Sequence, residues 1–188
     1  MERKLSAEQE KDLRHYRFVL DLFGLDPETF LNSVEDLNIS ETISMATYNV
    51  IRGEVLRNHN YINLCIEQII ILNIFGTGKQ LETSKKTAQY KILKPLLEDM
   101  NLQKKMQILK SIYNVPKEIE QKVMKLNRFR NEMAHNLDYR KREKTIIYMG
   151  KDINSDLGLK RFINDMSQIL NFLSGIIGSE YKRWSNTD

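Results

Sequence analysis

Four polar side chains suited to chemistry lie close together in residues 116–135, a segment whose apolar residues have helical spacing. Asn127, Asn131 and His135 follow one another at intervals of four, so a helix places them in one polar strip. Arg130 directly precedes Asn131. A guanidinium is always charged, an amide both donates and accepts hydrogen bonds, and an imidazole exchanges protons near neutral pH. Such a set is suited to stabilising a charged transition state and to moving a proton.

Arg130 also interrupts the apolar pattern of this segment. The apolar residues that recur at intervals of three and four around it are Ile119, Val123, Leu126, Met133 and Leu137. This spacing predicts a guanidinium at the centre of the apolar stripe, where it requires an acceptor or a ligand. Glu67, the one carboxylate in the apolar run 65–72, is the hypothetical ion-pair partner of Arg130. The alternative is a purely structural role: an ion pair in a core or interface for Arg130, and a C-terminal helix cap for His135.

The same region carries the positive charge of the chain. Residues 125–144 hold seven basic and three acidic side chains, whereas the remaining 168 residues hold 22 of each, and the whole chain has a net charge of +4. The basic residues are Lys125, Arg128, Arg130, Arg140, Lys141, Arg142 and Lys144. This concentration is what a polyanion-binding face needs. The alternative is a solvated loop that follows a helix.

The run Arg130-Asn131-Glu132-Met133-Ala134-His135 resembles the signature of the HEPN superfamily, which is very often written R-N-x-x-A-H. The Asn after Arg130, the Ala before His135 and the apolar helix leading into the motif make the likeness specific. The resemblance covers about residues 39–181. It implies an all-α fold, an up-and-down HEPN-like helical bundle, over residues 39–188, with residues 1–38 as an N-terminal helical extension.

The resemblance also implies an activity, that of a metal-independent endoribonuclease acting as a homodimer. In that reading His135 is the general acid or base, Arg130 stabilises the charged phosphorane, and Asn131 orients the phosphate or His135. The 2′-hydroxyl of the RNA attacks, which leaves a 2′,3′-cyclic phosphate. The basic residues Arg128, Arg140, Lys141, Arg142 and Lys144 would hold the RNA. A role in bacterial or archaeal defence or as a toxin with a cognate antitoxin follows from the same resemblance.

One position departs from part of the family. Some members that are paired with a nucleotidyltransferase antitoxin carry Tyr two residues after the His, whereas this chain has Leu137 there and its nearest tyrosine is Tyr139. Two other functions stay open: a non-catalytic module of the HEPN type for binding or dimerisation, which the resemblance also allows, and a helical nucleic-acid-binding regulator.

Other chemistry finds little support in the sequence. The run 76–80 is similar to the end of a phosphate-binding loop, but Asn73 stands where the first Gly belongs and Gln80 replaces Ser or Thr. The three histidines and Cys65 are scattered, so we expect no metal and no cofactor. Cys65 is expected to be a small buried hydrophobe. The N-terminus is densely charged, and the most hydrophobic segment, 62–75, is too short and too interrupted to cross a bilayer. We therefore expect a cytoplasmic protein without a membrane partner.

The elements that must position the motif are helices. Eight Gly and three Pro among 188 residues, with 41% hydrophobic and 29% charged side chains, favour long helices with short connections. Periodicity and end signals predict helices at 6–23, 26–37, 39–56, 61–75, 87–100, 102–113, 116–135 and 157–181. Residues 39–75 are alternatively one long helix, 79–86 are expected to be a polar connection, and 145–149 is the only predicted extended segment.

Overall fold

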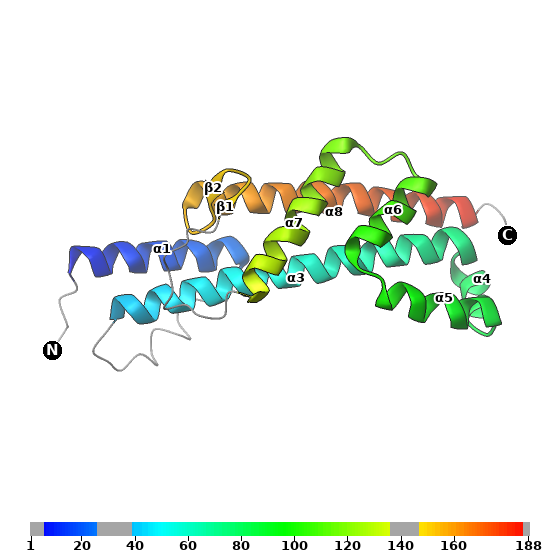
Figure 1. The fold of residues 1–188 in the computed structure, drawn as a ribbon, viewed down its shortest axis with the longest axis horizontal. Helices are drawn as coiled ribbons and strands as arrows, with labels where there is room; N and C mark the ends of the chain where they lie inside the picture. Colours follow the sequence, from blue (N-terminus) through cyan, green and yellow to red (C-terminus); the bar gives the residue numbers. More distant parts are fainter. Residues whose placement is uncertain (1–5, 26–38, 136–146, 186–188) are drawn as a thin grey trace. The chain divides into compact units, whose positions relative to one another are not determined.

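The computed structural model describes residues 6–25, 39–135 and 147–185, and this part of the chain is all-α apart from one small hairpin (Figure 1). The predicted all-α class is therefore confirmed. The helices are α1 (Ala7–Phe23), α3 (Ile39–Phe75), α4 (Gly78–Ser84), α5 (Ala88–Asp99), α6 (Leu102–Ile112), α7 (Lys117–His135) and α8 (Asp156–Ser185), and the strands are β1 (Ile147–Tyr148) and β2 (Lys151–Asp152). The helix predicted at 26–37 lies outside the described residues.

Local end signals explain where α1 begins and ends. Ser6 is its N-cap and forms a capping box with Gln9, in which each side chain bonds the backbone N–H of the other residue. Gly24 ends the helix in the left-handed conformation, with a φ of 67°. The helix predicted at 6–23 is confirmed. It could be predicted because both end signals are local and can be recognised in the sequence.

The alternative of one long helix is confirmed for residues 39–75, which form the 37-residue α3. The polar run Asn58-His59-Asn60 does not break the helix. Asn and His have lower helix propensity than Ala, but neither removes a backbone hydrogen bond as Pro does, so their cost is met by packing.

The prediction of a polar connection at 79–86 is wrong, because residues 78–84 form the short helix α4. Thr77 stands at its N-terminus in an extended conformation, and Gly78 follows with a φ of 53°. The run contains Lys, Gln, Leu and Glu, which are good helix formers. Its polar side chains are those of a helix at the surface, and they do not indicate a loop. The end predicted at residue 75 for the preceding helix is confirmed, since α3 ends at Phe75.

Side-chain caps also set the starts of the next two helices. The Thr87 side chain accepts from the N–H of Tyr90 at the start of α5, and the Asn101 side chain accepts from the N–H of Lys104 at the start of α6. Pro95 lies inside α5. The predicted helices at 87–100 and 102–113 are thus confirmed to within one or two residues at each end.

The extended segment predicted at 145–149 is confirmed in its described part as one strand of a hairpin. β1 pairs antiparallel with β2, in the register Ile147 with Asp152 and Tyr148 with Lys151. The two turn residues, Met149 and Gly150, have φ values of 49° and 79°. Positive φ at both positions is the pattern of a type I′ turn, which suits the twist of a two-residue hairpin.

The chain divides into two compact units. The first unit comprises Met1–Arg57 and Arg130–Phe162, and the second comprises Asn58–Phe129 and Ile163–Asp188, so α3, α7 and α8 each contribute to both. In the first unit, α1 and α3 share a core of Tyr16, Leu20 and Ile43. The division after residue 38 stays a prediction.

The core of the second unit consists of aliphatic side chains from its helices. Fully buried members from α3, α5, α6, α7 and α8 include Ile62, Ile66, Ile69, Leu97, Leu109, Val123, Leu126, Ile169 and Leu173. Among the described helices, none on its own is long and apolar enough to cross a membrane, although α3 and α4, with a 90° bend between them, pass that test as a pair.

Candidate functional site

The R-N-x-x-A-H motif forms the last part of α7. This helix begins after Pro116, carries Glu118 and Glu120 in its first turn, and ends at His135. Acidic residues near the N-terminus interact favourably with the helix dipole, and Pro is well tolerated at this boundary. The predicted helix at 116–135 is confirmed, so Arg130, Asn131 and His135 stand on its final turns.

Arg130 and Asn131 are joined by a hydrogen bond. Nη1 of Arg130 donates to Oδ1 of Asn131 over 3.1 Å. The Arg130 side chain is half-buried, and its Nε is buried without a hydrogen-bond partner among the described residues. Asn131 is exposed. Because its amide oxygen accepts from Arg130, the amide NH₂ of Asn131 is left to donate to a ligand.

The prediction that Arg130 lies at the centre of the apolar stripe is wrong in detail. The buried side chains of α7 include Lys122, Leu126, Phe129 and Met133, which recur at intervals of four, three and four. The centre of the buried stripe is therefore shifted toward this row, and Arg130 stands on its flank. A flanking guanidinium keeps part of its solvent contact, which lowers the cost of burying it.

The other predicted catalytic and RNA-binding residues are placed only in part. His135 is the last residue of α7, one turn after Asn131, and Arg128 is exposed on the same helix. The side chain of His135 lies outside the described part of the structure. So do the predicted RNA-binding residues Arg140, Lys141, Arg142 and Lys144.

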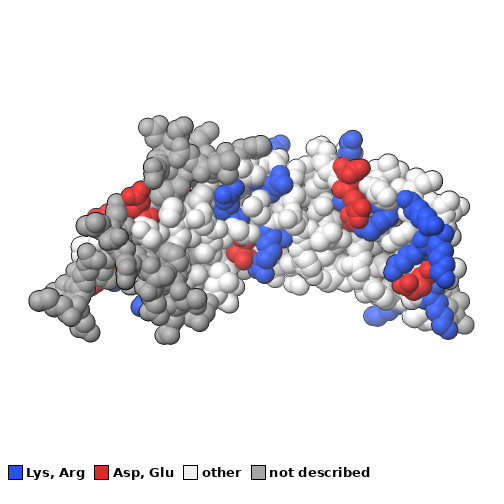
Figure 2. All heavy atoms as spheres, turned by 90° about the horizontal axis from the view of Figure 1, so that it is seen from below, with Lys and Arg blue, Asp and Glu red and all other residues white. Residues whose placement is uncertain are grey.

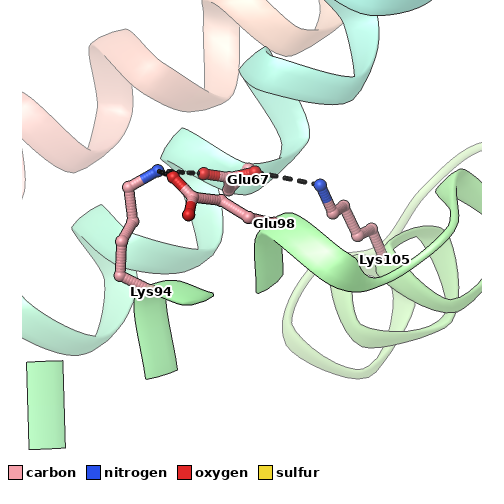
Figure 3. A network of polar contacts seen from close by, with 4 residues as sticks. All are labelled: Glu67, Lys94, Glu98 and Lys105. Atoms are coloured by element: carbon pink, nitrogen blue, oxygen red, sulfur yellow. Dashed lines mark hydrogen bonds and ion pairs between the residues drawn. The ribbon is translucent and has the colours of Figure 1, made fainter. Parts of the chain in front are cut away.

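Glu67 is buried and paired, as expected, but not with the expected partner. Its carboxylate accepts from Nζ of Lys105 over 2.9 Å and from Nζ of Lys94 in a second, short contact (Figure 3). The hypothesis that Arg130 is its partner is therefore wrong. Lys105 is 0% exposed and Glu67 is 3% exposed, while Lys94 also bonds the exposed Glu98 over 2.8 Å.

This network explains why Glu67 is charged inside the second unit. Burial by itself raises the pKa of the Glu67 carboxyl, but the hydrogen bonds and charges of Lys94 and Lys105 outweigh burial and lower the pKa below its ordinary value. Hydrogen bonds to Glu67 and Glu98 raise the pKa of Lys94. The network is a structural contact that joins α3, α5 and α6.

A contact between His59 on α3 and Asn127 on α7 was not predicted from the sequence. His59 is buried on α3, and its Nε2 lies 3.0 Å from Oδ1 of Asn127 on α7. Its Nδ1 lies 3.4 Å from Oδ1 of Asn60. The available signal was a polar triplet, 58–60, within an otherwise apolar helix. Asn127 is thus engaged by a structural partner within the second unit.

A buried lysine on α7 was also missed. Lys122 is 3% exposed, lies 3.4 Å from Oδ1 of the fully buried Asp165, and bonds Glu118 and Gln168. The hydrogen bond to Glu118 is the main cause that raises its pKa. The signal was its place in the row with Leu126 and Met133. Among the residues described, no group of three or more His, Cys, Asp or Glu side chains is placed to hold a metal ion.

A second concentration of positive charge escaped the count that singled out residues 125–144. Residues 79–94, on α4, α5 and the turn between them, carry five lysines and one glutamate, a net charge of +4. Outside these two windows the chain holds 17 basic and 21 acidic residues. The acidic residues elsewhere offset the positive charge of residues 79–94. This charge is therefore seen only when the net charge is counted segment by segment along the chain.

Comparison with known proteins adds no relative. No family model matches the chain, and neither a curated protein nor a solved structure matches it.

Proposed function

We propose that the chain is a metal-independent endoribonuclease of the HEPN type that acts as a homodimer in a toxin or defence system. The observation that carries this proposal is the Arg130–Asn131 pair at the end of α7, with His135 one turn later. The pair offers a guanidinium next to an amide NH₂ that donates to no other side chain among the described residues. Hydrogen-bond donors of this kind stabilise the negative charge that develops on a phosphate in the transition state of cleavage. His135, on the next turn, is able to transfer a proton.

The residues suit a reaction in which the substrate supplies its own nucleophile. The RNA 2′-oxygen bonds to the adjacent phosphorus, the bond from phosphorus to the 5′-oxygen breaks, and a 2′,3′-cyclic phosphate and a 5′-hydroxyl remain. His135 takes the proton of the 2′-hydroxyl or gives one to the leaving 5′-oxygen. Arg130 stabilises the negative charge on the phosphorane, and Asn131 orients a phosphate oxygen.

The test is RNA cleavage by the purified protein in the presence of EDTA. We expect cleavage by the wild type and a loss of at least about 100-fold in rate for His135→Ala, because general acid–base catalysis contributes about 10²–10⁴-fold. RNA affinity should change little in His135→Ala, since the basic side chains supply most of the charge. Arg130→Ala should also lose cleavage. Both variants must retain the helical circular-dichroism spectrum of the wild type.

A matched control separates the role of Arg130 from the loss of any arginine. Arg14 on α1 has a side chain that is 70% exposed and pairs only with Glu10 in the described residues, over 3.8 Å. Arg14→Ala should therefore cleave RNA at the wild-type rate. Cleavage that survives His135→Ala, or products that carry only 5′-phosphates, would contradict the proposal. Light scattering measures the dimer directly, and a monomer at assay concentration would contradict that part.

A further inference from the structure

Residues 79–94 carry five lysines, here called the lysine surface: Lys79, Lys85, Lys86 and Lys91, which are exposed, and Lys94, which is half-buried. Lys79 is on α4, Lys85 and Lys86 are in the turn after it, and Lys91 and Lys94 are on α5. Figure 2 shows basic side chains gathered at the right-hand end of the face drawn, the end at which Figure 1 places α4 and α5. The whole surface belongs to the second unit.

Three of these lysines form no ion pair within the described residues: Lys79, Lys86 and Lys91, all of them exposed. Lys85 pairs with Glu82 at the surface over 2.6 Å, and Lys94 is held by Glu67 and Glu98. Like charges this close in sequence repel one another, and an anionic ligand relieves that repulsion.

The N-terminus of α5 adds to the positive electrostatic potential of the lysine surface. Thr87 caps this 12-residue helix, and no acidic residue occupies its first turn. The free backbone N–H groups and the positive end of the helix dipole therefore lie directly after Lys85 and Lys86 in the chain. Exposed polar side chains, Thr83 and Gln89, lie among the lysines.

We propose that the lysine surface binds the sugar–phosphate backbone of RNA, as a site separate in the chain from the R-N-x-x-A-H motif. Lysine, hydroxyl and amide side chains together with helix N-termini are the groups that contact phosphates. Interfaces with proteins are instead depleted in lysine and enriched in aromatic residues and arginine. That the polyanion is RNA rests on the proposed function, whereas the recognition of phosphate rests on the lysines themselves.

The experiment measures binding of a fluorescent single-stranded RNA to the full chain across a series of KCl concentrations. All proteins carry His135→Ala, so that cleavage does not interfere. The test variant is Lys79→Gln, Lys86→Gln and Lys91→Gln together. The matched control is Lys11→Gln, Lys117→Gln and Lys151→Gln, three exposed lysines outside the surface that also form no ion pair in the described residues. Both triple variants have the same net charge.

We expect the test variant to bind at least about tenfold more weakly at low salt. Its plot of log affinity against log salt should be less steep by about 2, since each lost phosphate contact with a single strand contributes about 0.7. The control should keep the affinity and slope of the His135→Ala parent. An equal loss in the control would assign the effect to overall charge and overturn the proposal. A competition assay adds unlabelled RNA or polyglutamate to the complex with fluorescent RNA. If polyglutamate displaced the fluorescent RNA more strongly than unlabelled RNA did, the proposal would be overturned in favour of an acidic protein.

The outcome also separates this proposal from the proposed function. Loss of RNA binding in the test variant, with no cleavage by the wild type, would support the lysine surface and contradict the ribonuclease. Cleavage by the wild type, with unchanged binding by the test variant, would support the ribonuclease and overturn the lysine surface.

Discussion

Replacement of Glu67 by Gln should be among the most destabilising single changes in the second unit. The substitution keeps the shape of the side chain but removes the charge that faces Lys105, whose side chain is 0% exposed. Lys105 then remains buried without the carboxylate that accepts its hydrogen bond. Removing one partner of a buried ion pair typically costs about 3–5 kcal/mol, because the remaining ion has lost its solvation without compensation.

This cost converts into a readily measured change. For a chain of this size, each kcal/mol shifts the unfolding midpoint by about 2–4 °C, so Glu67→Gln should lower it by roughly 6–20 °C. The assay is unfolding by urea and by heat, followed by circular dichroism, with wild type and variant at the same concentration. The free energy of unfolding in urea tests the energy, and the midpoint temperature tests the conversion.

Glu98→Gln is the matched control, since it makes the same chemical change on a carboxylate that also contacts Lys94. The Glu98 side chain is 56% exposed, so its loss should cost no more than about 1 kcal/mol. The double variant Glu67→Leu with Lys105→Met removes both buried charges and should recover much of the lost stability, because apolar residues of similar volume replace buried pairs well.

Two results would refute this reasoning. One is a cost for Glu67→Gln no larger than that for Glu98→Gln, and the other is a double variant less stable than Glu67→Gln. The pH dependence gives a third check. Since the pKa of Glu67 is lowered by folding, its contribution is present above the ordinary carboxyl pKa of about 4.3 and is lost as the pH falls through the lowered pKa. The difference between wild type and Glu67→Gln should therefore narrow in acid.

Two further predictions concern Tyr113 and the glycines of α8. Burial, and then a hydrogen bond to Glu180, raise the pKa of Tyr113 to about 12. Absorbance titration of the folded protein should therefore show one more tyrosine ionising near pH 12 in the wild type than in Tyr113→Phe. The stabilising contribution of this phenol is lost as the pH rises from about 10, the ordinary tyrosine pKa, through the raised pKa. A Cβ on Gly158 would lie 1.9 Å from the backbone oxygen of Asp152, so Gly158→Ala should lower the free energy of unfolding by about 1–3 kcal/mol or more. At Gly175 nothing lies within 4 Å of such a Cβ, and Gly175→Ala should instead raise stability by about 0.5–1 kcal/mol in the same urea assay.

The helices could be predicted from the sequence where their ends are determined by local chemistry. Ser6 and Gly24 mark α1, Thr87 begins α5, and Pro116 precedes α7, and each signal acts within a few residues. α4 was missed because a short exposed helix has little apolar periodicity, so its polar residues look the same as those of a loop.

The partners of buried charges could not be predicted in the same way. That Glu67 must be paired follows from its apolar neighbours, but its partners lie 27 and 38 residues away on α5 and α6. Tertiary packing selects among many lysines and arginines, and sequence spacing along one helix contains no information about this choice. The same limit applies to Lys122, since its place in the row with Leu126 and Met133 is consistent with burial but does not identify its partner Asp165 on α8.

Charge shows why a whole-chain sum is a poor guide to polyanion binding. The net charge of +4 is the result of two windows of +4 each, at 79–94 and 125–144, and a remainder of −4. At physiological salt, charges separated by more than about 8 Å of solvent are largely screened from one another, so a phosphate responds to the window beside it and hardly to distant carboxylates. A chain of modest total charge can therefore contain two strongly basic segments. The salt dependence of RNA binding reports the number of phosphates contacted. We therefore expect it to change with substitutions of the lysines in residues 79–94 and not with the net charge of the protein.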